Sequence, residues 1–453
     1  MKATASVASS LSPLVDHVVI IIKENHTYDN YFGTFPHSEG DNQLGTAQNP
    51  PSGDPNHRHE TWIKRETERR YRAQYREADI PCYFALARQY TLCDHFFSEV
   101  AGPSTPSHLM LITADSPVIN NPPFSSTPKN LYDLKSFPLA LQKAGLTWGN
   151  YGGYAFHYIR ELAALPGNHT RDLFAHQAAA GQLPSVSWVY GDGNPAYSEH
   201  PIQNITLGSE WTAQQIQAIV DGGLWPRTVV FVTWDDWGGW YDHVVPPNVE
   251  QWDSKRAQYP GDAHPEFDGQ QFRYGSRVPC LVISPYARKG FVSPTQRSHI
   301  SLVKFCQTLL GIQSVNPRLD TSDDMSDCFD PTQAPLAPPN LLPPTALGRG
   351  GGGGTSVPVP VPRKPQRPGR SPGRNQNHCR NHAGHIGDRV RFPGSELGRS
   401  WHCDRATSRL AWRVCFPILV AIPRSCVGHR NCCAHCGSKP LRSPSVRTNH
   451  ALI

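Results

Sequence analysis

The stretch DHVVIIIKEN, residues 16–25, decides the fold class, because it has the pattern of a buried strand that ends on an acidic residue. Its apolar run is rich in β-branched residues, which is typical of a buried parallel strand. A second run of this kind, TVVFVTWDD at residues 228–236, ends on two acidic residues. Open α/β sheets bind ligands at the carboxyl ends of such strands. The two runs therefore predict an α/β fold with a polar site at one edge of the sheet.

Other segments continue the alternation of strand and helix. We expect further core strands at residues 186–190 and 278–284, where short apolar runs occur. Helical patterns occur at residues 60–71, 85–97, 107–112, 137–144 and 300–310. Strands that alternate with helices are typical of α/β proteins, so the wider sequence supports the same fold class.

The composition divides the chain into two unlike parts. After residue 345 there are 18 Lys and Arg against 3 Asp and Glu, whereas the residues before it carry 25 against 34. The formal net charge of +6 therefore describes neither part. We predict a main domain at residues 14–345, a Gly/Pro-rich linker at 346–362 and a basic Cys/Arg-rich tail at 363–453. The tail lacks the apolar periodicity needed to offset its ordering entropy, so we expect it to be disordered.

Cysteines and apolar segments give little sign of export or membrane insertion. Five cysteines lie before residue 345 and seven after it, in an odd, scattered arrangement that does not indicate a disulfide framework. No apolar signal segment precedes the first strand. The apolar stretch at residues 416–423 is far shorter than the roughly 20 residues that span a bilayer. We therefore expect no transmembrane segment.

The acidic residues at the two strand ends predict a metal site. If the two strands are neighbours, Glu24, Asp235 and Asp236 bring three negative charges together, which is costly unless a cation compensates. Carboxylates with the Asn25 carbonyl favour a hard or borderline divalent ion. The sequence does not specify which ion. The alternative is that these side chains face solvent at the starts of loops, with Asn25 capping a turn.

A serine and three histidines are the candidate catalytic residues. Ser104 lies in a GPSTP turn before a predicted helix, where a hydroxyl either caps the helix or acts as a metal-activated nucleophile on a bound phosphate. The local sequence alone favours the cap. His57, His200 and His243 occupy turn or strand-end positions, from which a histidine can contact a phosphoryl oxygen or protonate a leaving alcohol. Any one of them is more often structural than catalytic, so only their convergence on the carboxylates would make a site.

The aromatic residues around the second acidic pair allow two interpretations. Trp234, Trp237, Trp240 and Tyr241 surround Asp235 and Asp236 in the sequence. Aromatic side chains at the mouth of a site would attract a quaternary ammonium headgroup through cation–π interactions. The alternative is that they pack in the core.

Five motifs, in order, make the sequence similar to a known family. They are ENHTYDNYFG at residues 24–33, GPSTPSH at 102–108, SEHP at 198–201, TWDDWGGWYDHV at 233–244 and RVPCLVISP at 277–285. They resemble the motifs of the bacterial phosphoesterase family that contains non-haemolytic phospholipases C and a group of acid phosphatases, within the alkaline-phosphatase-like superfamily. The resemblance runs from about residue 14 to about residue 315.

This resemblance implies a fold, a cofactor and a reaction. The implied fold is a three-layer α/β/α sandwich, and the implied reaction is hydrolysis of a phosphate ester through a phosphoserine at Ser104. His57 and His200 match family histidines that contact the phosphoryl group or the leaving oxygen. The implied ligands of the divalent metal ion are Glu24, Asn25, Asp235 and Asp236. Members of the family are often exported.

One departure from the family pattern and two alternatives remain. Many of the phospholipases have Pro-Asn-Arg after the nucleophile, whereas this chain has Pro106-Ser107-His108 and lacks that arginine. We expect a phosphoester substrate, monoester or diester, with phospholipid as one candidate, and no nucleic acid partner. A sulfatase-like hydrolase expects Cys/Ser-x-Pro-x-Arg and also lacks its arginine here. A non-enzymatic protein would instead bind an anionic surface through the basic tail.

Overall fold

A computed structural model of the chain describes residues 6–65, 70–123, 128–193 and 196–341. The main domain predicted at residues 14–345 falls almost wholly within these ranges. The predicted linker at 346–362 and the predicted disordered tail at 363–453 lie outside the described residues.

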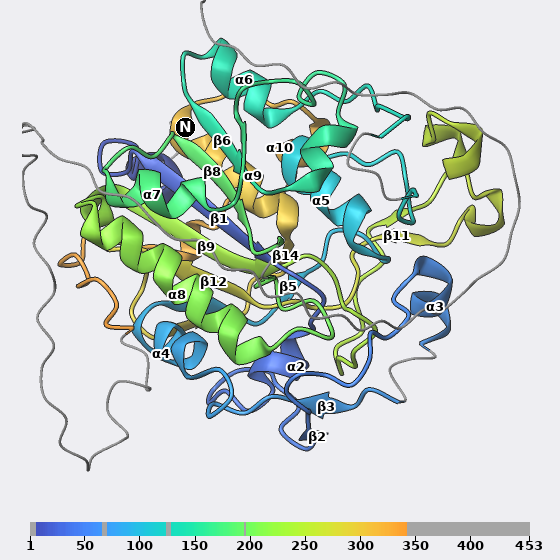
Figure 1. Cartoon of the computed structure of the whole chain (residues 1–453), viewed down its shortest axis with the longest axis horizontal. Helices are drawn as coiled ribbons and strands as arrows, with labels where there is room; N and C mark the ends of the chain where they lie inside the picture. Colours follow the sequence, from blue (N-terminus) through green and yellow to red (C-terminus); the bar gives the residue numbers. More distant parts are fainter. Residues whose placement is uncertain (1–5, 66–69, 124–127, 194–195, 342–453) are drawn as a thin grey trace, which may run out of the picture. The chain divides into compact units, whose positions relative to one another are not determined.

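An eight-stranded sheet runs through the domain in the order β13-β4-β12-β9-β1-β8-β6-β7 (Figure 1). Its strands are β1 (His17–Lys23), β4 (Thr91–Cys93), β6 (Trp148–Tyr151), β7 (Asn168–His169), β8 (Val186–Tyr190), β9 (Thr228–Trp234), β12 (Cys280–Ile283) and β13 (Phe291–Ser293). Neighbouring strands are parallel except where β12 pairs with β9 and β4, and both of those pairings are antiparallel. The sheet is therefore mostly parallel, as the apolar strands predict.

The two strands that end on acidic residues are direct neighbours. β1 pairs in parallel with β9 along its whole length, and the last pair in register joins Lys23 to Trp234. Every residue of β9 is buried, as is every residue of β1 after His17. Because the two strands end at the same level, the residues that follow them meet at one edge of the sheet.

Helices cover both faces of the sheet. The helices are α1 (Val7–Ser10), α2 (Tyr28–Phe32), α3 (His59–Lys64), α4 (Pro81–Gln89), α5 (Ser104–Thr113), α6 (Phe137–Lys143), α7 (Leu173–Ala179), α8 (Ile205–Asp221), α9 (His299–Leu310) and α10 (Pro317–Asp320). α8 packs against α7 and α4, whereas α9 packs against α1, α5 and α10. Figure 1 shows α8 in front of the sheet and α9 behind it. The predicted α/β/α sandwich is therefore confirmed.

Some predicted helix boundaries are wrong. The helix expected over residues 85–97 ends at Gln89, and Thr91–Cys93 forms β4 between β12 and β13. Pairing in the sheet decides this segment, because its short apolar run fits a buried strand as well as a helix. The helix expected from residue 107 begins three residues earlier, at Ser104. In the charged segment at 60–71, α3 ends at Lys64, and residues 66–69 lie outside the described ranges.

Three of the four aromatic residues beside the acidic pair pack in the core. Trp234, Trp237 and Trp240 are at most 4% exposed, and the indole N–H of Trp237 donates to the backbone carbonyl of His57 at 2.8 Å. The guanidinium of Arg72 covers the ring of Tyr241 at 3.6 Å. The three tryptophans therefore do not form an open aromatic mouth, and the core-packing interpretation holds for them, whereas Tyr241 is half-buried.

A buried ion pair lies directly below the acidic edge. The Nζ of Lys23 is 3.2 Å from Oε1 of Glu199, and both side chains are fully buried. Glu199 also accepts hydrogen bonds from the hydroxyls of Tyr31 and Tyr83 and from the indole of Trp234. This network joins the end of β1 to the backbone that carries His200.

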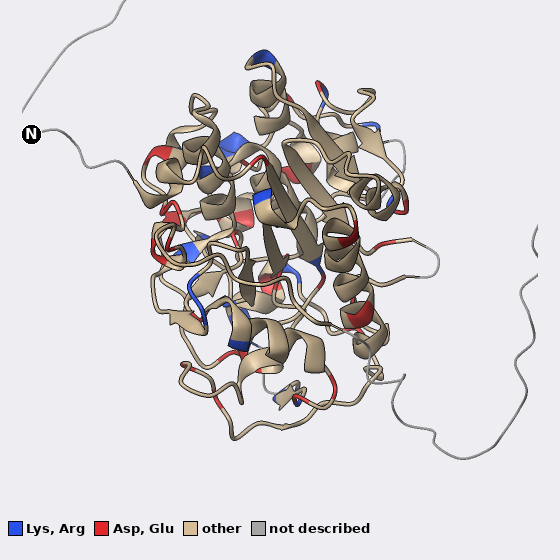
Figure 2. Ribbon diagram, turned by 90° about the vertical axis from the view of Figure 1, so that its left-hand side faces the viewer, with Lys and Arg blue, Asp and Glu red and all other residues tan. Residues whose placement is uncertain are grey.

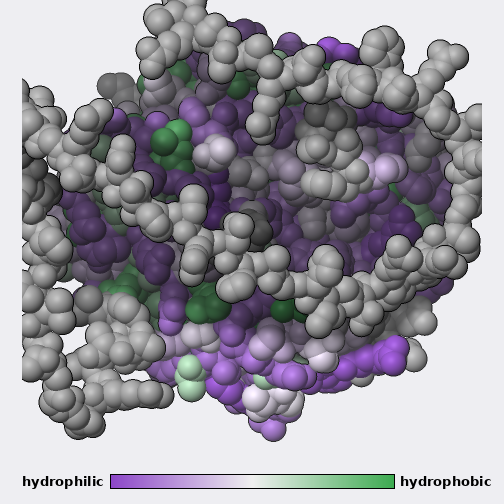
Figure 3. All heavy atoms as spheres, viewed as in Figure 1, coloured by the Kyte–Doolittle hydropathy of each residue, from purple (hydrophilic) through white to green (hydrophobic). Residues whose placement is uncertain are grey.

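The surface of the described residues is of mixed character. Figure 2 shows basic and acidic residues spread over many elements of the visible face. In Figure 3, hydrophilic residues gather along the lower edge, over the segment that holds the short strands β2 (Gly45–Thr46) and β3 (Ala73–Gln74). Among the described residues, every helix is too short or too polar to cross a bilayer.

Candidate active site

The ends of β1 and β9 bring the predicted acidic residues together. Glu24 is 6% exposed, and Asp235 and Asp236 are fully buried. The backbone N–H groups of Asn25 and Asp236 donate to Oδ1 of Asp235 at 3.0 and 2.8 Å. The alternative in which these carboxylates face solvent is therefore wrong.

The backbone around the cluster is unusually close-packed. Asn25 has a φ of +65°, in the left-handed region that Asn tolerates better than most residues. Gly238 also has a positive φ, and a Cβ at this position would lie 2.1 Å from the carbonyl oxygen of Asn25. Its N–H donates to Oδ1 of Asp236 at 2.7 Å. The glycine after the acidic pair thus lets one strand end pack onto the other.

Ser104 directs its hydroxyl into this cluster. Ser104 is the first residue of α5, and Pro103, the N-cap residue, makes no side-chain capping bond. The Oγ of Ser104 donates to Oδ2 of Asp236 at 3.0 Å and lies 3.4 Å from Oδ1 of Asn25. The backbone N–H of Thr105 donates a hydrogen bond to Oδ1 of Asn121 at 2.8 Å. The hydroxyl of Ser104 is therefore not a helix cap.

His57 and His200 lie beside each other next to Asn25. The Nε2 of His57 is 3.3 Å from Nδ2 of Asn25, and the centroids of the two imidazole rings are 6.2 Å apart. The Nδ1 of His57 contacts the carbonyl of Pro55 at 2.7 Å, and that of His200 contacts the carbonyl of Pro201. Because a carbonyl only accepts, each Nδ1 carries the proton. Each Nε2 is then the ring atom that can take up or give a proton at the site.

The pKa values of the three buried carboxylates shift in different directions. Burial raises the pKa of Glu24 well above its usual range, and the nearby charges of Asp192 and Asp235 raise it further. Burial and the charge of Asp235 likewise raise the pKa of Asp236. Burial would also raise the pKa of Asp235, but the adjacent His108 ring and the Asn25 N–H together lower it to about 2. A cation at this edge would favour ionisation of all three.

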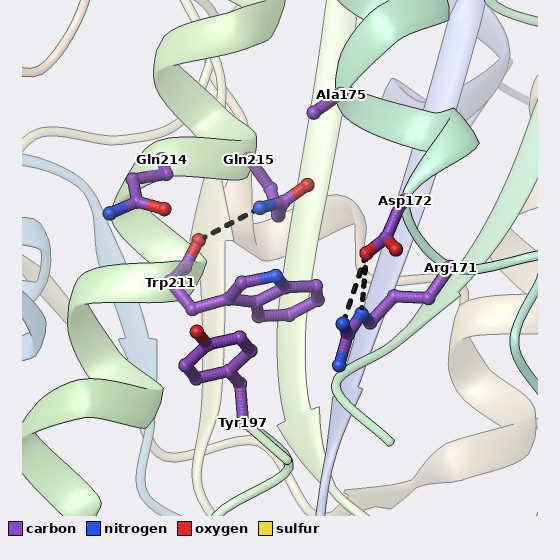
Figure 4. A pocket seen from close by; sticks show the side chains of 7 residues that line it. All are labelled: Arg171, Asp172, Ala175, Tyr197, Trp211, Gln214 and Gln215. Carbon is purple, nitrogen blue, oxygen red and sulfur yellow. Dashed lines mark hydrogen bonds and ion pairs between the residues drawn. The ribbon is translucent and has the colours of Figure 1, made fainter. Parts of the chain in front are cut away.

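A separate cavity of about 350 Å³ lies between α7 and α8 (Figure 4). Arg171 and Asp172 form an ion pair at its wall, and the rings of Tyr197 and Trp211 stack 6.3 Å apart. None of its lining residues belongs to the acidic cluster. The candidate active site is therefore distinct from this cavity.

The strand-end carboxylates, the helix-borne hydroxyl and the two histidines all lie in sequence that one family model covers. The model of the Phosphoesterase family matches residues 15–73 and 52–313. The chain belongs to the Phosphoesterase family.

Several bacterial phospholipases C are similar to this chain. The non-hemolytic phospholipase C of Pseudomonas aeruginosa is 27% identical over 67% of this chain and 55% of that protein. Phospholipase C B of Mycobacterium tuberculosis is 26% identical over 73% of this chain and 80% of its own length. The non-hemolytic phospholipase C of Burkholderia pseudomallei is 24% identical over 65% of this chain and 55% of its own length. The chain thus spans about half the length of the two non-hemolytic enzymes that it matches.

Solved structures give a weaker likeness. Murine ectonucleotide pyrophosphatase/phosphodiesterase 5 superimposes with a TM-score of 0.39 and 10% identity, over 70% of this phosphoesterase and 100% of that chain.

His243 contacts a different group of residues. Its Nδ1 is 2.7 Å from Oδ2 of Asp29, and the guanidinium of Arg277 bonds both Asp29 and Asp242. No contact in the described part of the phosphoesterase joins His243 to Ser104 or to the acidic cluster. Arg277 supplies the positive charge that this second acidic group needs. A catalytic role for His243 stays a prediction without support from its contacts.

Sequence reasoning missed two residues at the site of this phosphoesterase. Asp192 follows β8, the other neighbour of β1, and its charge contributes to the raised pKa of Glu24. The strand-end rule that found the other carboxylates would have found Asp192, had it been applied to residues 186–190. His108 lies one turn after Ser104 in α5, and its Nε2 is 3.2 Å from Oδ2 of Asp235. In the sequence, His108 stands out only as a departure from the phospholipase motif.

Proposed function

We propose that this chain hydrolyses phosphate esters with Ser104 as the nucleophile and with a divalent metal ion bound by Glu24, Asn25, Asp235 and Asp236. The observation that carries the proposal is the hydroxyl of Ser104, which is held by a buried carboxylate where two parallel strands end. A helix cap or a solvated surface serine would not have this environment.

The residues present fit a divalent cation. Oδ2 of Asp235 is fully buried, and it has no hydrogen-bond partner among the described residues. A buried carboxylate oxygen in this state is costly unless a cation is bound. The oxygen donors of the cluster suit a hard or borderline ion. Such an ion would lower the pKa of the Ser104 hydroxyl and stabilise negative charge on the phosphoryl oxygens.

The side chains of the site can carry out the two proton transfers. In the first half-reaction, Oγ of Ser104 gives its proton to Asp236 and forms a bond to phosphorus, while the bond from phosphorus to the leaving oxygen breaks. A protonated His57 or His200 gives a proton to that oxygen through Nε2. Water then attacks the phosphoserine, gives a proton to the same histidine, and releases Ser104 with the proton from Asp236.

The names of the relatives favour a phospholipase C type of diester substrate. A phosphomonoester is the second candidate, because the buried tryptophans offer no open aromatic box for a quaternary ammonium group. Rates on p-nitrophenyl phosphorylcholine and p-nitrophenyl phosphate decide between the two. A higher kcat/KM for the diester would support the phospholipase type, and a higher value for the monoester would support a phosphatase.

The nucleophile is tested with Ser104→Ala and a matched control. We expect Ser104→Ala to lower kcat by about 10³-fold or more, as is typical of a lost nucleophile. Ser107→Ala removes a hydroxyl from the same helix, where its Oγ accepts from the N–H of Val100 at 3.3 Å, and should keep most of the activity. Acid quenching during turnover should trap phosphate on Ser104. Full activity of Ser104→Ala, or phosphate trapped elsewhere, would refute the proposal.

A further inference from the structure

His108 is a fully buried histidine that faces the acidic cluster without a hydrogen bond. Its Nε2 lies 3.2 Å from Oδ2 of Asp235 and 3.8 Å from Oε1 of Glu24. Both ring nitrogens and Oδ2 of Asp235 are buried and have no hydrogen-bond partner among the described residues. The distance from Nε2 to Oδ2 of Asp235 is within hydrogen-bond range, but the ring is not aligned to donate to that oxygen. In a simple ion pair between His108 and Asp235, the ring N–H would be aligned with the carboxylate oxygen.

The spacing of these three atoms matches that of ligands around one ion. Nε2 of His108 and the carboxylate oxygens of Glu24 and Asp235 all lie within 4.8 Å of one another. Ligands at roughly 2.0–2.2 Å from a shared ion are separated by about 3–3.5 Å. The measured 3.2 Å fits this range, and the 3.8 Å separation needs only a small closure.

The other three carboxylate oxygens of Asp235 and Asp236 each accept a hydrogen bond from a protein group. Oδ1 of Asp235 accepts from two backbone N–H groups, Oδ1 of Asp236 accepts from Gly238, and Oδ2 of Asp236 accepts from Ser104. Oδ2 of Asp235 is therefore the uncommitted oxygen of the pair, and it is the one that faces His108. The ring centroids of Tyr154 and Tyr190 lie 5.2 and 5.4 Å from that of His108, so these two rings restrict the orientation of the imidazole.

We propose that His108 is a ligand of the metal ion, together with Glu24 and Asp235. This inference rests on the proposed function and adds a nitrogen ligand to the oxygen ligands named there. Imidazole nitrogen suits Zn²⁺, Mn²⁺ and other transition ions better than Mg²⁺ or Ca²⁺, which prefer oxygen ligands alone. The site is therefore selective for a transition metal ion.

Pulsed electron paramagnetic resonance of the full chain loaded with Mn²⁺ tests the ligand directly. We expect the modulation of a directly bound ¹⁴N nucleus, replaced by that of ¹⁵N when the chain carries ¹⁵N-histidine. The signal should vanish in His108→Gln. It should persist in His57→Gln and in His299→Gln, a fully buried histidine whose ring nitrogens contact the carbonyl of Trp234 and the N–H of Glu99. We also expect the ratio of Zn²⁺ to Mg²⁺ affinity to fall at least about tenfold in His108→Gln.

The possible outcomes separate this inference from the proposed function. Bound Mn²⁺ without histidine coupling in the unaltered chain would refute the role of His108, even if His108→Gln fails to fold. Ser104-dependent hydrolysis would then still support the proposed function. Coupling lost in His57→Gln but kept in His108→Gln would also refute the role of His108. A chain that binds no divalent ion, and whose hydrolysis survives a chelator, would refute the metal in both proposals.

Discussion

Asn25 and Gly238 show how single residues build the site. The positive φ of Asn25 turns the chain sharply after β1, so its side chain reaches both Ser104 and His57. The missing Cβ of Gly238 makes room for the carbonyl of Asn25. Two residues with special backbone conformations are thus needed to hold one strand end against the other.

We predict that Gly238→Ala inactivates and destabilises the protein. The new Cβ would lie 2.1 Å from the Asn25 carbonyl oxygen, at a backbone conformation that alanine disfavours. We expect a loss of about 2 kcal/mol or more in the free energy of unfolding. The kcat should fall at least about tenfold, because a small displacement at a site is costly. Urea denaturation and steady-state kinetics measure both effects.

Gly261→Ala is the matched control for this prediction. A Cβ at Gly261 would have no heavy atom within 4 Å, apart from its own chain neighbours, and Gly261 does not have a positive φ. Its stability should change by less than about 0.5 kcal/mol, with activity unaltered. Equal stability and equal kcat in the two variants would contradict the prediction that Gly238 is needed for the close approach of Asn25.

The residues of the site were predictable where a strand pattern preceded them. Glu24, Asp235 and Asp236 each follow a largely apolar strand, and parallel strands place such residues at one edge. His108 was not predictable in this way, because it lies within a buried helix whose rotation decides where the side chain points. His243 has a typical turn position, but the buried guanidinium of Arg277 draws its neighbours Asp29 and Asp242 into a separate group.

At the scale of elements, strands were predicted better than helix ends. The strands β1, β8, β9 and β12 lie where the apolar runs placed them. The pattern did not reveal that β12 is antiparallel to both of its neighbours. Strand direction follows from the connections across the sheet, whereas the apolar run specifies only burial. The helix predicted from residue 107 begins at Ser104, because the side chain of Asn121 binds the N–H of Thr105.

We predict that Asn121→Ala impairs catalysis through α5. Asn121 is exposed, and its side chain bonds the first turn of the helix that carries Ser104. Loss of such a bond costs about 1 kcal/mol and removes one restraint on the position of the first turn, where a small displacement of Ser104 lowers the rate. Asn316→Ala removes a comparable bond from the start of α10, to the N–H of Arg318 at 3.0 Å. We expect a similar loss of stability in both variants, and a fall in kcat in Asn121→Ala alone. A fall in kcat in both variants would contradict this prediction.

At the scale of the whole domain, ion pairs join segments that are distant in the sequence. Glu250, in β10 (Glu250–Gln251), binds the guanidinium of Arg318 in α10 through both carboxylate oxygens, at 2.6 and 2.8 Å. Arg256 donates to the same carboxylate at 2.6 Å. Burial would raise the pKa of Glu250, but the two arginines lower it to about 2.

This shift predicts a pH-dependent effect of Glu250→Gln. The folded-state pKa lies below the unfolded value of 4.5, so the stabilisation is complete above pH 4.5 and is lost as the pH falls toward 2. Urea denaturation should show a loss of roughly 3 kcal/mol in Glu250→Gln near neutral pH, shrinking to about half near pH 3. Glu77 pairs with Arg88 at the exposed surface. The substitution Glu77→Gln should lower the free energy of unfolding by at most about 1 kcal/mol at any pH. A loss in Glu250→Gln that does not vary with pH would contradict the prediction.

The deep burial of α5 has a consequence for the behaviour of the protein on heating. Every residue from Ser104 to Thr113 is buried, so the nucleophile cannot come loose while the surrounding core stays intact. Thermal inactivation should then follow the same curve as loss of tertiary structure. Substitutions that raise the melting temperature elsewhere in the domain should raise the upper temperature limit of catalysis by the same amount.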